Sequence, residues 1–441
     1  MADNEQLKRA AFAAIDEGAA GLEQYAASVA REPEFGFKEF KTAEKVKAQF
    51  EKLGIPYRSE LAITGVKGEL KGGSPGPTIA ILGELDAMGC PEHPLADPDT
   101  GAAPACGHHI QQAAMLAAAC GLARSGVMKE LAGRVVFFAV PAEEYVQIAY
   151  RKKLVEAGKI HYIHGKGQLI YEGEFDDIHM AMQIHSQKNC PQPTVAIGQS
   201  SNGFIGKTIR YIGKTAHAAD APDQGVNALN AAILGLMGIN ALRETFREAD
   251  HIRVHPIITK GGDLVNNIPD DVRIETYVRG ATMEAIDRTH KRVDAALKAG
   301  GMANGARVEI DTLPGQLPLI CNGPLNDLFA ANAQGVLPGV KLVDAGHFSA
   351  STDMGDVSHL MPAIHPFIGG TDGILHGAGF KVVDFNAAAL LPGKTFAGMV
   401  IDLLSDGAAR AKEILRDYKP ALTKDEYIAK LDSYFSKGED Q

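Results

Sequence analysis

The pattern of apolar and polar positions divides the first part of the chain into alternating helices and strands. Residues 5–53 have helical periodicity with one Pro- and Gly-containing interruption, so two helices joined by a turn are expected. Residues 61–70 and 77–85 predict strands separated by a Gly/Pro/Ser turn. An Ala-rich segment at 108–124 predicts a helix, and 134–140 is a continuous apolar run typical of a buried parallel strand. This alternation predicts an α/β layered architecture.

A different pattern covers residues 202–314, where strands and helices form a self-contained series. The predicted strands are 207–212, 252–259, 272–279 and 307–312, and the predicted helices are 226–246 and 283–298. The order βαββαβ is that of a ferredoxin-like domain. Because α/β character returns afterwards, we expect an inserted domain at 202–316 between two parts of one catalytic domain, 1–201 and 317–441.

Composition and charge narrow the partners of this chain. Its 441 residues are 45% hydrophobic, enough for a sizeable core, and 54 acidic against 44 basic residues give a net charge of -10. We therefore expect a small-molecule substrate and no nucleic acid or membrane partner. No apolar run reaches the length needed to cross a bilayer, and residues 1–5 are acidic and polar, unlike a secretory signal. These features predict a cytoplasmic location.

The segment with the clearest metal-binding chemistry is Ala105-Cys106-Gly107-His108-His109, which opens the Ala-rich helix. Five scattered cysteines do not form a disulfide framework, so at least one can be a ligand or a nucleophile. Cys106 and His108 are two residues apart in a loop, and a thiolate with an imidazole is a typical ligand set for zinc or a similar transition metal. A plain loop or core role for this pair stays open.

Two adjacent carboxylates, Glu143 and Glu144, follow the buried strand at 134–140. Ligands of open α/β sheets bind at the carboxyl ends of the strands, where one carboxylate can hold a metal and its neighbour can move protons. A helix N-terminus enriched in Glu for its dipole is the alternative. His185 closes a short apolar strand and His376 lies in a Gly-rich loop, and either histidine alone also fits a structural role.

Eight segments in order along the chain carry a resemblance to a known family. They are residues 32–40, Glu84-Leu85-Asp86-Ala87, Cys106-Gly107-His108, Pro141-Ala142-Glu143-Glu144, Ile184-His185, 213–219, 266–270 and Leu375-His376. In this order they resemble the M20 family of metallopeptidases, in its aminoacylase and p-aminobenzoyl-glutamate hydrolase-like branch. The resemblance implies a mixed-sheet, zinc-peptidase-type catalytic domain with an inserted dimerisation or lid domain.

The resemblance also implies a metal shell for one or two divalent transition-metal ions, Zn or Mn, in each subunit. The implied ligands are Cys106, His108, Glu144, His185 and His376. Glu143 is then the general base. Asp86 orients a ligand from behind the shell, and Asp353 resembles another acidic position near the site, with a turn or cap role equally open.

In the inserted domain, the resemblance implies that His217 stabilises the oxyanion, often in the partner subunit of a homodimer. Asn267 and Arg279 fall where the family holds its substrate, although a solvated strand position explains Arg279 equally well. The chain departs from the family at Pro104, which usually is His, and at His109, which usually is Asp or Asn. We count His109 as a substrate-binding candidate because it adds a hydrogen-bond donor.

Three functions fit these features. The first is metal-dependent hydrolysis of a C–N amide bond in a small N-acyl or N-aroyl amino acid. The second is an aminohydrolase of the same type that releases ammonia from an aromatic amine or an amidine carbon, which the departures at Pro104 and His109 motivate. The third is a non-catalytic homologue that binds a small molecule, against which the presence of both Glu143 and Glu144 argues.

Overall fold

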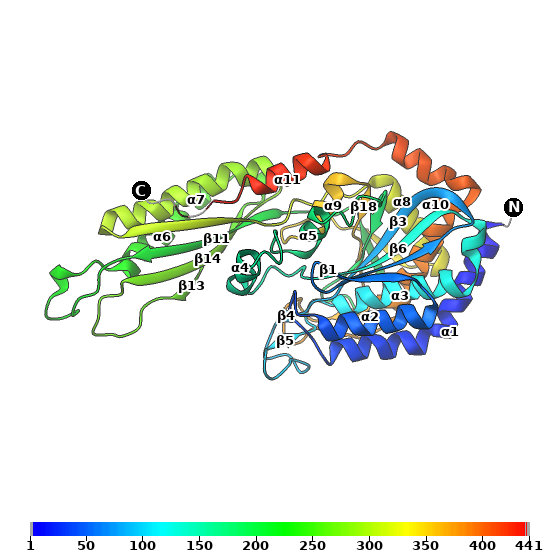
Figure 1. The fold of residues 1–441 in the computed structure, drawn as a ribbon, viewed down its shortest axis with the longest axis horizontal. Coiled ribbons are helices and arrows are strands. Elements are labelled where there is room, and N and C mark those ends of the chain that lie inside the picture. The colour runs from blue at the N-terminus through cyan, green and yellow to red at the C-terminus, as the bar shows by residue number, and fades with distance from the viewer. Residues whose placement is uncertain (1–2, 437, 439–441) are drawn as a thin grey trace. The chain divides into compact units, whose positions relative to one another are not determined.

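The computed structural model describes residues 3–436 and 438, which form two compact units (Figure 1). The first unit contains the described part of Met1–Gln199 together with Ile320–Gly346 and Asp356–Thr423. The second contains Ser200–Leu319, His347–Gly355 and the described part of Lys424–Gln441. The inserted domain expected from the sequence, 202–316, does not include His347–Gly355 or the described part of Lys424–Gln441.

Specific pairings explain why two late segments join the second unit. Strand β17 (His347–Phe348) pairs in parallel with β10 (Ser200–Ser201). Helix α9 (Met354–Leu360) follows β17. Near the end of the chain, Asp287 accepts hydrogen bonds from Lys430 Nζ of α11 (Lys424–Asp432) at 2.6 Å and from Tyr434 Oη at 2.7 Å. Residues beyond 317 therefore contribute to both units.

The first unit is built on a mixed six-stranded sheet in the order β1-β2-β6-β3-β7-β18. These strands are β1 Tyr57–Leu61, β2 Gly65–Lys71, β6 Ala132–Val140, β3 Ser74–Glu84, β7 Met180–Met182 and β18 Ala363–Ile364. The β1–β2 and β2–β6 pairs are antiparallel, whereas β6, β3, β7 and β18 pair in parallel. The predicted mixed α/β fold class is confirmed.

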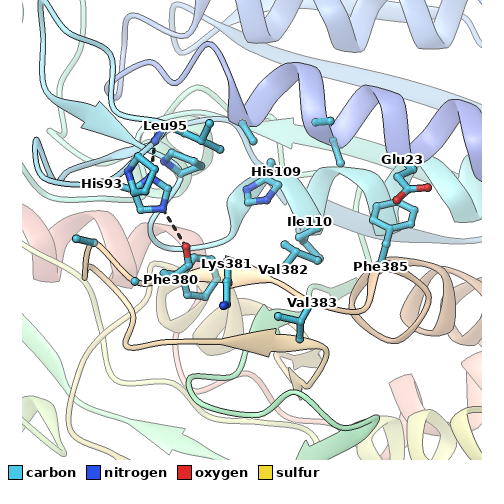
Figure 2. A pocket seen from close by; sticks show the side chains of 17 residues that line it. Glu23, His93, Leu95, His109, Ile110, Phe380, Lys381, Val382, Val383 and Phe385 are labelled. Atoms are coloured by element: carbon cyan, nitrogen blue, oxygen red, sulfur yellow. Dashed lines mark hydrogen bonds between the residues drawn. The ribbon is translucent and has the colours of Figure 1, made fainter.

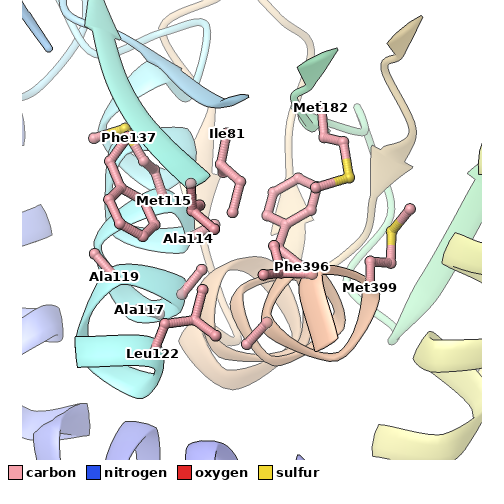
Figure 3. Close-up of a cluster of buried hydrophobic side chains, with 14 of the residues drawn as sticks. Ile81, Ala114, Met115, Ala117, Ala119, Leu122, Phe137, Met182, Phe396 and Met399 are labelled. Atoms are coloured by element: carbon pink, nitrogen blue, oxygen red, sulfur yellow. The ribbon is translucent and has the colours of Figure 1, made fainter. Parts of the chain in front are cut away.

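Helices around this sheet form the main core. The sheet is contacted by α2 Phe40–Leu53, α3 His108–Arg124, α8 Gly323–Val336 and α10 Leu391–Asp417, and α1 Asn4–Ala30 packs on α3 and α10. Figure 3 shows Ile81 and Phe137 of the sheet facing Met115 of α3 and Phe396 of α10. Small side chains let α3 approach closely, because a Cβ on Gly83 of β3 would lie 3.0 Å from Gln112 Cα. Close packing at this point fixes the start of α3, where the predicted metal ligands lie.

Smaller elements complete the first unit. The helices are α4 Ile148–Glu156 and α5 Gly165–Tyr171, and a second sheet has the order β16-β9-β19-β8. Its strands are β16 Lys341–Asp344, β9 Thr194–Ile197, β19 Phe367–Ile368 and β8 His185–Ser186. Two short ribbons pair β4 Met88–Gly89 with β5 Ala102–Ala103 and β20 Thr371–Asp372 with β21 Lys381–Val382.

One helix among the described residues, Asn386–Asp417, is long and apolar enough to cross a membrane by length and composition. Of its most apolar 18-residue window, 89% is buried inside the protein. The helix is not an uninterrupted apolar run, because Lys394, Asp402 and Asp406 lie within it, and its apolar side chains form core contacts.

The second unit has the predicted ferredoxin-like order of elements. They are β11 Gly203–Ile212, α6 Ala228–Leu242, β12 Arg253–Val254, β13 Ile257–Lys260, β14 Asp271–Gly280, α7 Met283–Asn304 and β15 Arg307–Pro314. The sheet order is β12-β14-β11-β15, and β13 also pairs with β14. The sequence predicted one strand at 252–259, but the structure divides it into β12 and β13. Pro256 lies between them and has no backbone N–H for a continuous ladder.

Candidate metal centre

Potential ligands of the first unit lie at the ends of its strands. The predicted ligand Glu144 and the predicted base Glu143 follow β6, the predicted ligand His185 begins β8, and Glu84, which was not predicted as a ligand, ends β3. Cys106 and His108 flank Gly107, which has φ +84° and caps the N-terminus of α3. Only glycine suits this position, because a Cβ there would lie 2.3 Å from Ser186 Oγ.

Three groups of potential ligands have donor atoms within 4.8 Å of one another. They are Cys106 with His108 and His185, Cys106 with Glu144 and His376, and Glu84 with His108 and Glu143. Cys106 Sγ lies 3.3 Å from His185 Nε2, and His376 Nε2 lies 3.1 Å from Glu144 Oε1. The fold thus brings together all five predicted ligands and the predicted base, from four separate segments of the chain.

Asp86 ties two of these segments together. Its Oδ1 lies 3.1 Å from His108 Nδ1, and its backbone oxygen lies 2.8 Å from the same nitrogen. Its Oδ2 accepts a hydrogen bond from the backbone N–H of Glu144 at 2.9 Å. A carboxylate behind a ligating histidine fixes the ring orientation and leaves the other ring nitrogen for a metal. This geometry fits the orienting role expected for Asp86.

The electrostatics of the cluster favour a thiolate. Burial and the Glu144 carboxylate raise the pKa of Cys106, but His185 and His108 outweigh them and lower it to about 6. The Glu144 carboxylate raises the pKa of His376 to about 11 against the opposing effect of burial. Thiolate, carboxylate and imidazole groups at this density form the mixed donor set that transition metals bind.

Two buried donor atoms support a fit to a metal ion. His108 Nε2 and Glu144 Oε1 are buried and make no aligned hydrogen bond within the described structure, although Glu84 Oε2 and His376 Nε2 each lie 3.1 Å away. Buried polar atoms without a partner are costly, and a metal ion satisfies several at once. The residues present therefore fit a divalent transition metal.

Sequence reasoning missed the buried polar network around Glu84. The Glu84 carboxylate is fully buried and accepts hydrogen bonds from Lys166 Nζ at 2.7 Å, Gln183 Nε2 at 2.6 Å and Gln111 Nε2 at 2.9 Å. Burial alone raises the pKa of Glu84, but Lys166 and His108 reverse this and keep it well below its usual range. The only sequence signal was the position of Glu84 two residues before Asp86 at the end of a buried strand.

Glu39 supports the turn that carries Glu143. Its buried carboxyl accepts hydrogen bonds from the backbone N–H of Ala142 at 2.8 Å and from Thr64 Oγ1 at 2.7 Å. Ala142 has φ +51°, an uncommon conformation for a residue with a side chain, and the bond to Glu39 holds it. Burial, followed by repulsion from Asp86, raises the pKa of Glu39 to about 8.

His109 lines a small hollow together with His108, Cys106 and Asp86, and it also lines a larger cavity that His108 does not reach. It is absent from the three donor groups of the described residues and lines a cavity with His93 and Phe380 (Figure 2). Burial, with the nearby His108 and His93, lowers the pKa of His109 to about 3, so the ring is neutral. Pro104 lines the same cavity, so both departures from the family pattern lie at one place.

The remaining predicted residues belong to the second unit. His217 and Asn267 are exposed and form an isolated β-bridge, and His217 Nδ1 accepts hydrogen bonds from the backbone N–H groups of Ala219 and Asp220. Arg279 Nη1 donates to Ser351 Oγ at 2.6 Å, and its guanidinium lies 4.8 Å from the Phe204 ring centroid. Asp353 is fully buried directly before α9.

A family model described as a peptidase dimerisation domain matches residues 199–303. This match covers most of the ferredoxin-like unit, and the fold of the remaining chain is that of the M20 peptidases. The predicted resemblance to the M20 family is thereby confirmed, and the class is that of metal-dependent hydrolases acting on C–N bonds.

Two relatives and one solved structure are similar to this chain over most of its length. An Xaa-Arg dipeptidase of Mus musculus is 29% identical over 399 residues, covering 85% of this chain and 83% of the relative. An N-acetyl-L-cysteine deacetylase of Bacillus subtilis (strain 168) is 27% identical over 349 residues, covering 77% and 78%. Among solved structures, the Bacillus subtilis YXEP protein, a dinuclear metal-binding peptidase from the M20 family, has a TM-score of 0.64 and 22% identity. That match covers 87% of this chain and 98% of the other.

Proposed function

We propose that this chain hydrolyses the amide bond of a small N-acyl or N-aroyl amino acid or a dipeptide in a metal-dependent reaction. The observation that carries the proposal is the placement of Glu143 and Glu144 after β6, each within a different donor group. Dipeptidase and deacetylase activities among the relatives support the same substrate class. The products are then a carboxylic acid and a free amine.

Glu143 is the proposed general base. It takes a proton from the attacking water and delivers it to the leaving nitrogen, while Glu144 holds a metal. Cys106, His108, His185 and His376 are the other proposed ligands. The metal, Zn or Mn, would supply Lewis-acid polarisation of the carbonyl and would lower the pKa of water.

His217 is the proposed donor to the oxyanion that develops on the substrate carbonyl. Its Nδ1 accepts two backbone N–H groups, which leaves the ring proton on Nε2. An exposed imidazole with its proton on Nε2 can donate to a substrate oxygen. Asn267, which pairs with His217, and Arg279 are proposed to bind the substrate's backbone and carboxylate, and His109 and Asp353 stay candidates for roles near the site.

A substrate screen tests this function. Purified protein supplied with Mn²⁺ or Zn²⁺ is incubated with N-acyl amino acids, N-aroyl amino acids and dipeptides, and both released amine and ammonia are measured. We expect release of amine with a carboxylic acid, lost on chelation. Release of ammonia instead would reject amide hydrolysis and support the alternative function, that of an aminohydrolase.

Two cysteine variants separate a ligand from a packing residue. Cys106→Ser is expected to lower metal content and activity together, because the thiolate lies in two donor groups. Cys120→Ser is the matched control, since Cys120 is buried in α3 and contacts Ala14 O at 3.5 Å. Equal metal content in both variants would argue against Cys106 as a ligand.

We also propose that the second unit forms a homodimer. On α6, Ile233, Leu234 and Met237 are 43%, 41% and 60% exposed. Within residues 3–436, strand β13 pairs with β14 alone, so it offers a free strand edge. Exposed apolar side chains beside an open edge favour association, and Met237→Lys is expected to convert a dimer to a monomer in sedimentation experiments.

A further inference from the structure

The first unit contains a cavity of about 550 Å³ that the metal centre does not use (Figure 2). Its walls come from the end of α1, the loop at 93–95, the start of α3 and the segment 378–385. Among the described residues, no member of the three donor groups lines it. The volume falls within the range of small-molecule sites, about 300–1,000 Å³.

The lining of this cavity is mainly apolar and includes Ala27, Ile110, Phe380 and Val382. The charged side chains of Glu23 and Lys381 are exposed, so they lie where the cavity meets solvent. An apolar interior with few polar groups suits an uncharged ligand rather than an ion.

Two histidines give the interior its polar character. Both ring nitrogens of His93 already have partners in the cavity wall. Its Nδ1 accepts a hydrogen bond from the backbone N–H of Leu95 at 3.1 Å, and its Nε2 lies 2.9 Å from the backbone oxygen of Phe380. His109 is different: it is 7% exposed, and its Nδ1 is buried with no hydrogen-bond partner in the described structure. In Figure 2 the His109 ring lies between His93 and Ile110. A buried nitrogen without a partner, beside an apolar cavity, marks the place for one polar group of a ligand.

We propose that this cavity is a second ligand site, which binds a small, uncharged, mainly apolar molecule whose one hydrogen-bonding group pairs with His109. The apolar part of the ligand contacts the walls formed by α1 and Val382, and the polar group satisfies the imidazole. This binding needs no metal ion and does not rest on the proposed amide hydrolysis; His109 then serves the ligand of this cavity instead of the substrate of the metal centre.

Two matched probes test the site on the full-length protein. The phenol 4-methylphenol has the required shape and one hydroxyl, and toluene lacks the hydroxyl. Binding is followed by ligand-observed NMR titration. We expect saturable binding of 4-methylphenol with a dissociation constant of about 1 mM or lower. We expect toluene to bind about three- to ten-fold more weakly, the usual effect of one neutral hydrogen bond.

Variants locate the binding. Ala27→Phe fills the cavity from α1 and is expected to weaken both probes at least about ten-fold. Ala20→Phe, at an exposed position of the same helix outside the lining, is the control and is expected to change nothing. Val383→Phe narrows the cavity from the opposite wall, so the test does not depend on one variant folding. His109→Phe is expected to remove the preference for 4-methylphenol over toluene.

The outcomes are distinct from those of the hydrolase proposal. Protein treated with a chelator is expected to bind 4-methylphenol as well as metal-loaded protein does. No saturable binding of either probe, or unchanged binding in folded Ala27→Phe and Val383→Phe variants, would overturn the second site. Loss of binding on chelation would also overturn it, because the phenol would then occupy the metal centre.

Discussion

Two groups of predicted functional residues, Cys106 with His108 and Glu144 in the first unit and His217 with Asn267 in the second, are held in opposite ways. In the first unit, Cys106, His108 and Glu144 are buried, and Asp86 and the Glu84 network brace them. In the second unit, His217 and Asn267 are exposed on two loops that an isolated β-bridge joins through backbone contacts. Ligands of a metal need fixed geometry, which requires surrounding hydrogen bonds, whereas a group that meets a substrate must stay accessible.

This contrast predicts different consequences of substitution in each unit. Replacements in the first unit should act through metal binding, stability or proton transfer. Replacements at His217 should act on the rate alone.

Glu143→Gln removes the proposed base and keeps the size of the side chain. We expect the rate to fall by about 100- to 10,000-fold, because proton transfer to and from the reacting groups is lost. Metal content, measured by atomic emission, should stay unchanged, since Glu144 is retained. An active Glu143→Gln enzyme would require another base.

Lys166→Met leaves the buried Glu84 carboxylate without its charged partner. We expect the free energy of unfolding to fall by about 3–5 kcal/mol, the usual cost of breaking a buried ion pair. Lys159→Met, at an exposed lysine nearby in sequence, is the control and should change little. If Lys166→Met/Glu84→Gln is no more stable than Lys166→Met, the pair does not act as a unit.

His217→Ala removes the proposed oxyanion donor from the exposed loop. We expect kcat to fall by about 100- to 1,000-fold. The affinity for metal and the thermal stability should remain those of the wild type, as they should for Lys214→Ala, an exposed neighbour in the same loop. A lowered metal affinity in His217→Ala would contradict the division of roles between the units.

Glu39→Gln tests the pH dependence of the turn before Glu143. The folded-state pKa of Glu39 is raised to about 8, so the native protein retains a proton that the unfolded chain releases above its ordinary pKa of 4.5. The contribution of protonated Glu39 to the free energy of unfolding is therefore full below about pH 4.5, and it is lost as the pH rises towards 8. We expect the urea midpoint of wild type to fall more than that of Glu39→Gln between pH 5 and pH 8.5. Parallel curves would show that Glu39 is ionised in the folded state.

The sequence predicted the fold class because periodicity and turn residues act locally. The helix predicted at 108–124 has the bounds of α3, and the βαββαβ order was read from alternating strands and helices. The broken strand at Pro256 was missed because the apolar residues on both sides continue the pattern. The pairing of β17 with β10 joins residues 147 positions apart, which no local pattern encodes.

The candidate site shows the same limit. Cys106, His108 and Glu144 carry visible chemistry and ordered motifs, and the structure brings them together with His185 and His376. Lys166, Gln183 and Gln111 lie in segments with no motif, so their convergence on Glu84 appears only in three dimensions. The roles that the resemblance implies for the five predicted metal ligands, and for Arg279 and Asp353, stay predictions.

The division of the first unit into separate chain segments constrains the order in which the chain can fold during synthesis. Strand β18 pairs with β7, and α10 covers β3, so the sheet is complete only when residues beyond 391 have left the ribosome. Until then, the apolar faces of β3 and α3 lack their final cover. The strands and helices from β11 to β15, which end at residue 314, emerge earlier, although the second unit also receives β17 and the segment from Lys424 later. The early segments of the first unit thus wait for their final cover until most of the chain has been synthesised.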